Sequence, residues 1–174
     1  MDMLDVILAR RSVRQYTAEP IPEDKLNAIL YAGLAAASSK NRRPWEFVVV
    51  RDRAMLDALG ECRPGASNLL GKCTAAVVVC ADAETVDVWV EDCGSAMTQM
   101  HLMADALGAG SCWLQIRLRK AADGRDSADV VRSLLGVPAK YGVMCLLTLG
   151  MPAEHPAPRK VDELPLEKIH HEHF

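Results

Sequence analysis

The run at residues 74–81, TAAVVVCA, constrains the fold of this chain more than any other segment. It is apolar at nearly every position and rich in β-branched valine, which is typical of a strand that is buried on both faces. Such a strand requires cover on each side of its sheet. Further strands are predicted at residues 45–50, 111–116 and 142–149.

Helical spacing of apolar residues predicts the segments that supply this cover. The longest pattern covers residues 85–107, where apolar side chains recur at intervals of three and four residues. Gly94, Ser95 and Ala96 lie in its middle, and their small size would let another helix pack closely. Shorter helices are predicted at residues 2–11, 22–36, 53–60 and 127–135.

These elements alternate without a strict β-α-β order, and helices outweigh strands. We therefore predict an α+β fold with a central mixed β-sheet flanked by helices. A chain of 174 residues, half of them hydrophobic, can build one core, and we expect a single domain over residues 1–174. The polar, proline-rich segment 152–174 is predicted to be a tail that is either unpacked or wrapped around a partner.

Charge and composition argue against several classes of protein. The formal net charge is −3, whereas a general nucleic-acid binder is usually basic. The apolar runs are too short to cross a bilayer, and the N-terminus does not resemble a secretory signal. The six cysteines form no C-x-x-C pair, so we predict no metal site and a reduced, cytoplasmic chain.

The segment RRSVR at residues 10–14 follows the first predicted helix. An arginine fork matches two phosphate oxygens, and a serine hydroxyl can add a further hydrogen bond. The segment is therefore a candidate phosphate site, and a solvated charged surface is the alternative. A second segment, SSKNRRPW at residues 38–45, precedes a predicted strand and favours the phosphate interpretation.

Together these segments resemble the nitroreductase family of FMN-dependent oxidoreductases. That family opens with an RRSxR element and later carries a PSxxNxQPWxF element that leads into a strand. The second element reads ASSKNRRPWEF at residues 37–47, with Ala37 in place of the usual proline and Arg43 in place of the usual glutamine. The resemblance continues through residues 68–72, 108–113 and 150–154, so it covers nearly the whole chain.

The resemblance implies a nitroreductase fold in an intertwined homodimer, with the tail at 152–174 embracing the partner subunit. It also implies bound FMN, whose phosphate needs cationic partners if it is buried. Arg159 and Lys160 correspond to the basic C-terminal residue that closes on this phosphate, although they could instead be solvated surface charges. The implied phosphate grip is Arg10, Arg11, Ser12 and Arg14, closed by Arg159 and Lys160.

Other residues are implied to contact the flavin ring. The loop with Ser38, Ser39 and Asn41 would reach the flavin of the other subunit, and a self-bonded turn is the alternative. Asn68 resembles the family's asparagine that faces the isoalloxazine ring. A backbone N–H near the start of the strand at 111–116 would approach flavin N5, with Leu114 and Gln115 as the candidate donors.

The implied activity is a two-electron reduction of a small-molecule acceptor such as a nitroaromatic or a quinone. NAD(P)H would be the transient reductant in a ping-pong cycle, and no side chain is expected to be catalytic because the cofactor carries the chemistry. Alternatives are another reaction of the same family (dehalogenation, flavin destruction or heterocycle dehydrogenation), an FMN-binding redox sensor without fast NAD(P)H turnover, and an interaction domain without a cofactor.

Overall fold

Four strands form one sheet in the spatial order β1-β2-β4-β3. The computed structural model describes residues 2–174 of the chain. Residues 75–81 of β2 are apolar and buried because β2 lies between β1 and β4 and both faces of the sheet are covered. The strands are β1 (Trp45–Val50), β2 (Ala75–Asp82), β3 (Gly110–Gln115) and β4 (Tyr141–Gly150).

The α+β class with a central sheet and flanking helices is confirmed, but the sheet is not mixed. The three pairings β1–β2, β2–β4 and β3–β4 are all antiparallel. Strands buried on both faces are most common in parallel sheets, and that association misled the prediction. Here both faces of an antiparallel sheet are covered, so burial carries no information about strand direction.

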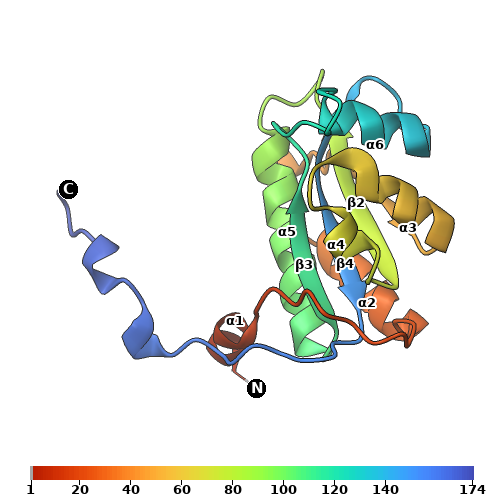
Figure 1. Ribbon diagram of the computed structural model, residues 1–174. Helices are drawn as coiled ribbons and strands as arrows, with labels where there is room; N and C mark the ends of the chain where they lie inside the picture. Colours follow the sequence, from red (N-terminus) through yellow and green to blue (C-terminus); the bar gives the residue numbers. More distant parts are fainter. Residues whose placement is uncertain (1) are drawn as a thin grey trace.

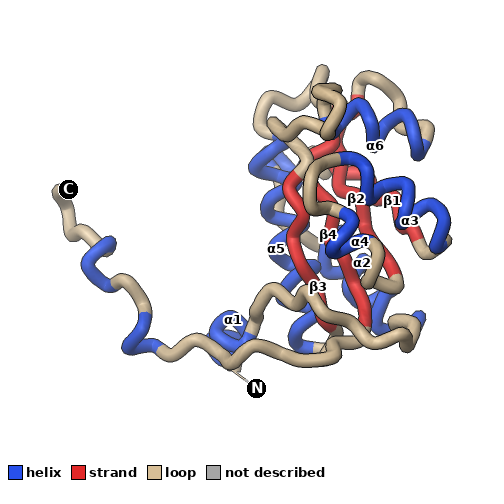
Figure 2. Tube along the Cα trace, viewed as in Figure 1, coloured by secondary structure: helices blue, strands red, loops and turns tan. Residues whose placement is uncertain are grey.

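Two helical layers cover the two faces of the sheet (Figures 1 and 2). On one face α5 (Trp89–Ala106) lies against the sheet, and α2 (Glu23–Leu34) packs beside it. On the other face lie three shorter helices. Val77 and Val79 join the core on the α5 side, whereas Val78 joins the opposite core. The short helices are α3 (Arg53–Leu59), α4 (Ser67–Leu70) and α6 (Ser127–Leu135).

The first helix is shorter than its apolar pattern predicted. α1 (Met3–Ala9) begins at a capping box in which Asp2 and Asp5 each accept a backbone amide. It ends before the arginines, so Arg10 and Arg11 lie in extended chain instead of in the last turn of a helix. The early end of α1 matters because the extended backbone that follows it can run along the edge of a sheet.

The C-terminal tail leaves the body of the molecule after β4 (Figure 1). It contains two single-turn 3-10 helices, η3 (Val161–Glu163) and η4 (Leu166–Lys168). Val161, Leu166 and Ile169 are each more than half exposed on it. Within residues 2–174 no helix has the length and apolar character needed to span a membrane.

We expect Gly142→Ala to destabilise the fold by about 1–3 kcal/mol, because the indole ring of Trp89 occupies the space that the added methyl group needs. A Cβ at this position would lie 2.6 Å from Cη2 of Trp89, in the first turn of α5. Urea unfolding measures the loss. In a Trp89→Leu background the same substitution should cost less, and equal costs in the two backgrounds would contradict this explanation.

Candidate functional site

The segment at residues 10–17 is held in extended form between β3 and the start of the tail. The Val13 amide donates to the Ser111 carbonyl on the outer edge of β3 at 2.9 Å. Further along, the Thr17 amide donates to the Met151 carbonyl at 2.8 Å. These two bonds fix the backbone on which the predicted phosphate grip is mounted.

Two glycines make this close approach of the segment possible. Gly110 and Gly150 are paired across β3 and β4, and the segment lies directly over them. A Cβ at Gly110 would come within 2.8 Å of Cγ1 of Val13, and one at Gly150 within 2.9 Å of Cδ1 of Tyr16. Side chains at these two positions would push the arginine-bearing segment away from the sheet.

A cavity of about 560 Å³ lies where α1, α5, β3, the segment 10–17 and the tail meet. Arg159 reaches it from the tail because its amide donates to the Leu8 carbonyl at 3.0 Å and its guanidinium to the Arg10 carbonyl at 3.2 Å. Residues from the two ends of the chain therefore share one cavity. Its lining side chains are Ile7, Arg10, Ser12, Thr98, His101, Leu102, Trp113 and Arg159.

The cavity is electropositive. It is lined by two guanidiniums, and no Asp or Glu is among its lining residues in the described chain. Burial and the neighbouring charge of Arg159 lower the pKa of Arg10, although an arginine remains charged. The positive charge of these two side chains would be neutralised by a small anion in the cavity, such as a phosphate group.

His101 is the cavity residue that sequence reasoning missed. Helical spacing alone would pair it with Asp105, four residues further along α5. Instead its Nε2 lies 2.8 Å from the Arg10 guanidinium, and its Nδ1 lies 2.5 Å from Oγ of Ser111. Burial, reinforced by the charge of Arg10, lowers the pKa of His101 to about 4, so the imidazole is neutral near pH 7.

Asp105 is engaged elsewhere. Its Oδ1 lies 2.7 Å from Nε2 of His155, in the tail, and it also accepts the Arg11 amide at 3.4 Å. The Nδ1 of His155 lies 2.9 Å from the Pro156 carbonyl, so both ring nitrogens face oxygen acceptors. This contact fastens the first part of the tail to α5.

The remaining residues of the predicted grip do not line this cavity. Arg11 donates to the Ala157 carbonyl of the tail, and Arg14 donates to the Ser12 carbonyl at 3.3 Å. Lys160 is exposed, and its backbone amide donates to the Glu163 carboxylate at 3.1 Å. The structure thus brings Arg10, Ser12 and Arg159 together at the cavity. Arg11, Arg14 and Lys160 are not among its lining residues.

The geometry of β3 distinguishes between the two candidate backbone donors. Successive residues of an edge strand point their N–H and C=O groups to alternate sides. The carbonyls of Ser111 and Gln115 both accept bonds from outside the sheet, the latter from Arg63 at 2.9 Å. The Gln115 amide therefore faces the free edge, whereas that of Leu114 faces β4 and its side chain is buried.

Asn68 is exposed on α4, in a segment that lies on the same side of the molecule as the free edge of β3. On one side of it, Arg63 donates to Gln115; on the other, Lys72 donates to the Gln15 side chain at 3.1 Å. Asn68 therefore lies in a stretch that is anchored both to β3 and to the arginine-bearing segment.

The predicted flavin loop lies apart from this cavity within one chain. The Arg43 backbone amide donates to the Ser38 hydroxyl, and Nε of Arg43 donates to Oδ1 of the Asn41 side chain, both at 2.9 Å. The amide of Ser39 donates to Oδ1 of Asp92 at 2.8 Å. Asp92 precedes His101 by nine residues of α5, which is about 13 Å along the helix axis.

Asp92 anchors this loop and was not predicted. It is 5 % exposed, and its Oδ2 has no hydrogen-bond partner among the described residues. The loop it holds contains three residues with left-handed backbone, Lys40, Asn41 and Arg43, with φ values of 52°, 56° and 49°. Because non-glycine residues adopt this conformation at a cost, the anchor helps to stabilise the loop.

We expect Asp92→Ala to speed tryptic cleavage after Lys40 and Arg42 by roughly tenfold or more, because it removes a charge-assisted bond to the Ser39 amide. Limited proteolysis followed by mass spectrometry measures the rates. Asp92→Asn retains an oxygen acceptor and is the matched control, expected near the wild-type rate. Equal rates for the alanine variant and the wild type would show that Asp92 does not hold the loop.

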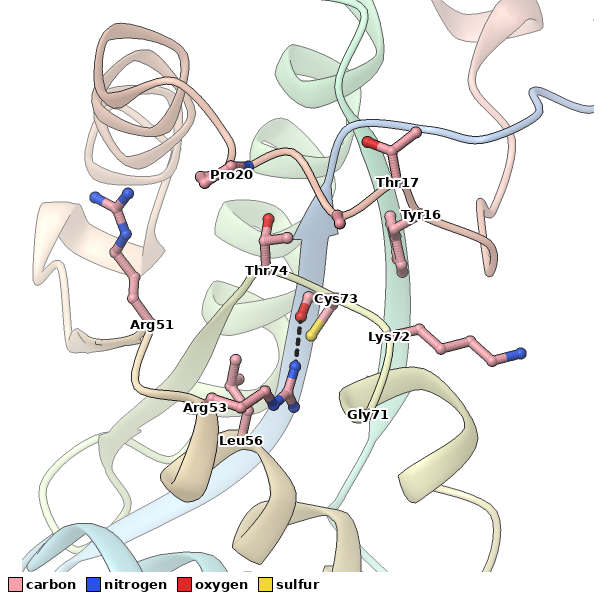
Figure 3. Close-up of a pocket in the computed structure, with 11 residues that line it drawn as sticks. Tyr16, Thr17, Pro20, Arg51, Arg53, Leu56, Gly71, Lys72, Cys73 and Thr74 are labelled. Carbon is pink, nitrogen blue, oxygen red and sulfur yellow. Dashed lines mark hydrogen bonds between the residues drawn. The ribbon is translucent and has the colours of Figure 1, made fainter.

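A second cavity, of about 570 Å³, lies beside residues 16–20, and Figure 3 shows its lining. Its cations are already engaged by protein groups. Arg53 pairs with Asp57 at 2.9 Å, Arg51 pairs with Glu23, and Lys72 extends away from the hollow. This cavity therefore lacks the free positive charge of the one that Arg10 lines.

Comparison with known proteins identifies the family to which this fold belongs. The family model described as "Nitroreductase family" matches residues 7–70 and 63–151. The chain is 31 % identical to an NADH dehydrogenase of Thermus thermophilus, and the alignment covers 97 % of this chain and 95 % of that protein. The chain belongs to the nitroreductase family, which confirms the resemblance found in the sequence.

Solved structures show the same fold. An FMN-dependent nitroreductase from Clostridium difficile superposes with a TM-score of 0.95 at 38 % identity, covering 99 % of this chain and 100 % of that one. An NADPH:FMN oxidoreductase from Vibrio harveyi, solved in complex with NAD+, gives a TM-score of 0.81 at 26 % identity, covering 98 % of this chain and 77 % of that one.

Metal and thiol chemistry find little support in the described part of the chain. No group of three or more His, Cys, Asp or Glu side chains there is arranged to hold a metal ion. All six cysteines are free and buried. Burial raises the pKa of Cys62, Cys73 and Cys80 to about 11, so these thiols are poor nucleophiles near pH 7.

Proposed function

We propose that this protein is an FMN-dependent oxidoreductase that uses NAD(P)H to reduce nitroaromatics, quinones or similar small acceptors. The observation that carries the proposal is the electropositive cavity in which Arg10, Ser12 and Arg159 converge from distant parts of the chain. Its donor set fits a phosphate monoester, because two guanidiniums and a hydroxyl face a cavity without a competing carboxylate.

The chain's residues bind and orient the cofactor. Arg10, Ser12 and Arg159 hold the phosphate, and the free edge of β3 offers the Gln115 amide to the ring. When bound, FMN would supply the redox chemistry, which is two-electron transfer between NAD(P)H and the acceptor. Since one bound cofactor would serve NAD(P)H and the acceptor in turn, we expect ping-pong kinetics, and we expect no side chain to act as an acid or base.

We further propose that the working unit is a homodimer. The loop that carries Ser38, Ser39 and Asn41 does not line the cavity of its own chain, so a second copy would be needed to bring the loop to a flavin. The exposed apolar side chains of the tail, such as Leu166 and Ile169, are also suited to cover a partner subunit. The six free cysteines suit a reducing cytoplasm.

The visible spectrum of the purified protein tests the proposal. We expect bound flavin that bleaches when NADH or NADPH is added without oxygen and returns when a quinone or nitroaromatic follows. Flavin that stays oxidised would favour a redox-sensing module or another reaction of the family. A protein that binds no FMN, even after incubation with it, would refute the proposed function.

A further inference from the structure

We propose that His101 is a positioning residue for Arg10: it holds this guanidinium at the phosphate site and thereby sets the preference for phosphorylated over unphosphorylated flavin. The identity of the anion as a flavin phosphate rests on the proposed function. The positioning role rests on the contacts of His101 alone, which join α5, β3 and the arginine-bearing segment.

The hydrogen-bond partners of His101 define its tautomer. A guanidinium can only donate, so Nε2, at 2.8 Å from Nη1 of Arg10, must be the acceptor. The ring proton is then on Nδ1 and is donated to Oγ of Ser111 at 2.5 Å. The backbone carbonyl of Ser111 accepts the Val13 amide, so the same residue also holds the segment that carries Arg10.

A neutral acceptor suits this position better than a carboxylate would. Arginine is usually held in place by Asp or Glu, which neutralises its charge and competes with an incoming phosphate. The imidazole fixes one N–H of Arg10 and leaves the positive charge and the remaining donors available. Asp105, one turn further along α5, contacts His155 and the Arg11 amide instead.

Two substitutions separate the two bonds of the imidazole. The amide oxygen of His101→Gln can reach the place of Nε2 and accept from Arg10, although the bond to Ser111 is lost. The amide nitrogen of His101→Asn can take the place of Nδ1 and donate to Ser111, although Arg10 is released. The pair is therefore matched, because each variant retains one bond of a buried polar side chain and loses the other.

The experiment compares the affinities of FMN and riboflavin, measured by quenching of flavin fluorescence, for the full-length wild type and both variants. We expect His101→Asn to lose roughly tenfold or more in FMN affinity, as for a displaced charged donor, and to bind riboflavin as the wild type does. His101→Gln should keep FMN affinity close to that of the wild type. Thermal unfolding of each variant confirms that it is folded.

Two results would overturn the positioning role. Both variants could bind FMN as tightly as the wild type does, or both could lose FMN and riboflavin affinity in parallel, as a general loss of structure would cause. The proposed function fails separately if the wild type binds neither flavin. In that event inorganic phosphate is the probe: it should raise the unfolding temperature of the wild type and His101→Gln but not of His101→Asn, and equal shifts would overturn the role.

Discussion

Arg10→Ala is expected to weaken FMN binding by about 10- to 150-fold and to leave riboflavin binding unchanged, because a hydrogen bond between charged groups contributes about 1.5–3 kcal/mol. The guanidinium lines the cavity, is partly buried and is held by His101. Its loss would remove a donor aimed at the phosphate without altering the edge of β3 on which the ring is proposed to lie.

Flavin fluorescence titrations measure both affinities. Arg125→Ala is the matched control, since it removes the same side chain from an exposed position paired with Asp123, outside the cavity. It should leave both affinities at the wild-type value. An Arg10→Ala protein that discriminates between FMN and riboflavin as well as the wild type does would show that the phosphate binds elsewhere.

Lowering the pH from 6.5 to 4 is expected to cost the wild type about 3 kcal/mol of stability through His101 alone. The pKa of this imidazole is about 4 in the folded protein and about 6.5 in the unfolded chain. Between these values the unfolded state binds the additional proton, so stability falls as the pH falls. Protonation would also remove the acceptor that Nε2 offers to Arg10.

Urea unfolding of the wild type and of His101→Gln between pH 7 and pH 4 isolates this contribution. Other groups titrate in both proteins, so the difference between the two curves is the informative quantity. The wild-type curve should fall more steeply below pH 6.5. Parallel curves would show that His101 is not the buried neutral base described above.

Local sequence was a good guide to where elements form. The apolar strand at 74–81 and the helix predicted at 127–135 agree with β2 and α6 to within a residue at each end. Prediction was poorer at the ends of α5 and α1: α5 begins at Trp89 instead of residue 85, and α1 ends before Arg10. Helix ends depend on contacts with other segments, which apolar spacing does not report.

The sequence located the arginines of the site but not what orients them. Arg10, Ser12 and Arg159 were recognisable as phosphate-binding residue types, and the structure places them at one cavity. His101 and Asp92 gave no such signal, because a single buried polar residue on an amphipathic helix resembles any other until its partner is known. Both partners, Arg10 and Ser39, are more than fifty residues away in the chain.

By itself the sequence determined the α+β class, the doubly buried strand and the membership of a family, because these follow from local patterns of apolar residues and from motifs that are contiguous in the chain. Only the tertiary structure decided that the sheet is antiparallel, that Gln115 and not Leu114 offers its amide to the free edge, and that His101 holds Arg10. Strand direction, the side to which a backbone group points and the partner of a buried side chain are set by contacts between distant residues, and no local pattern encodes them.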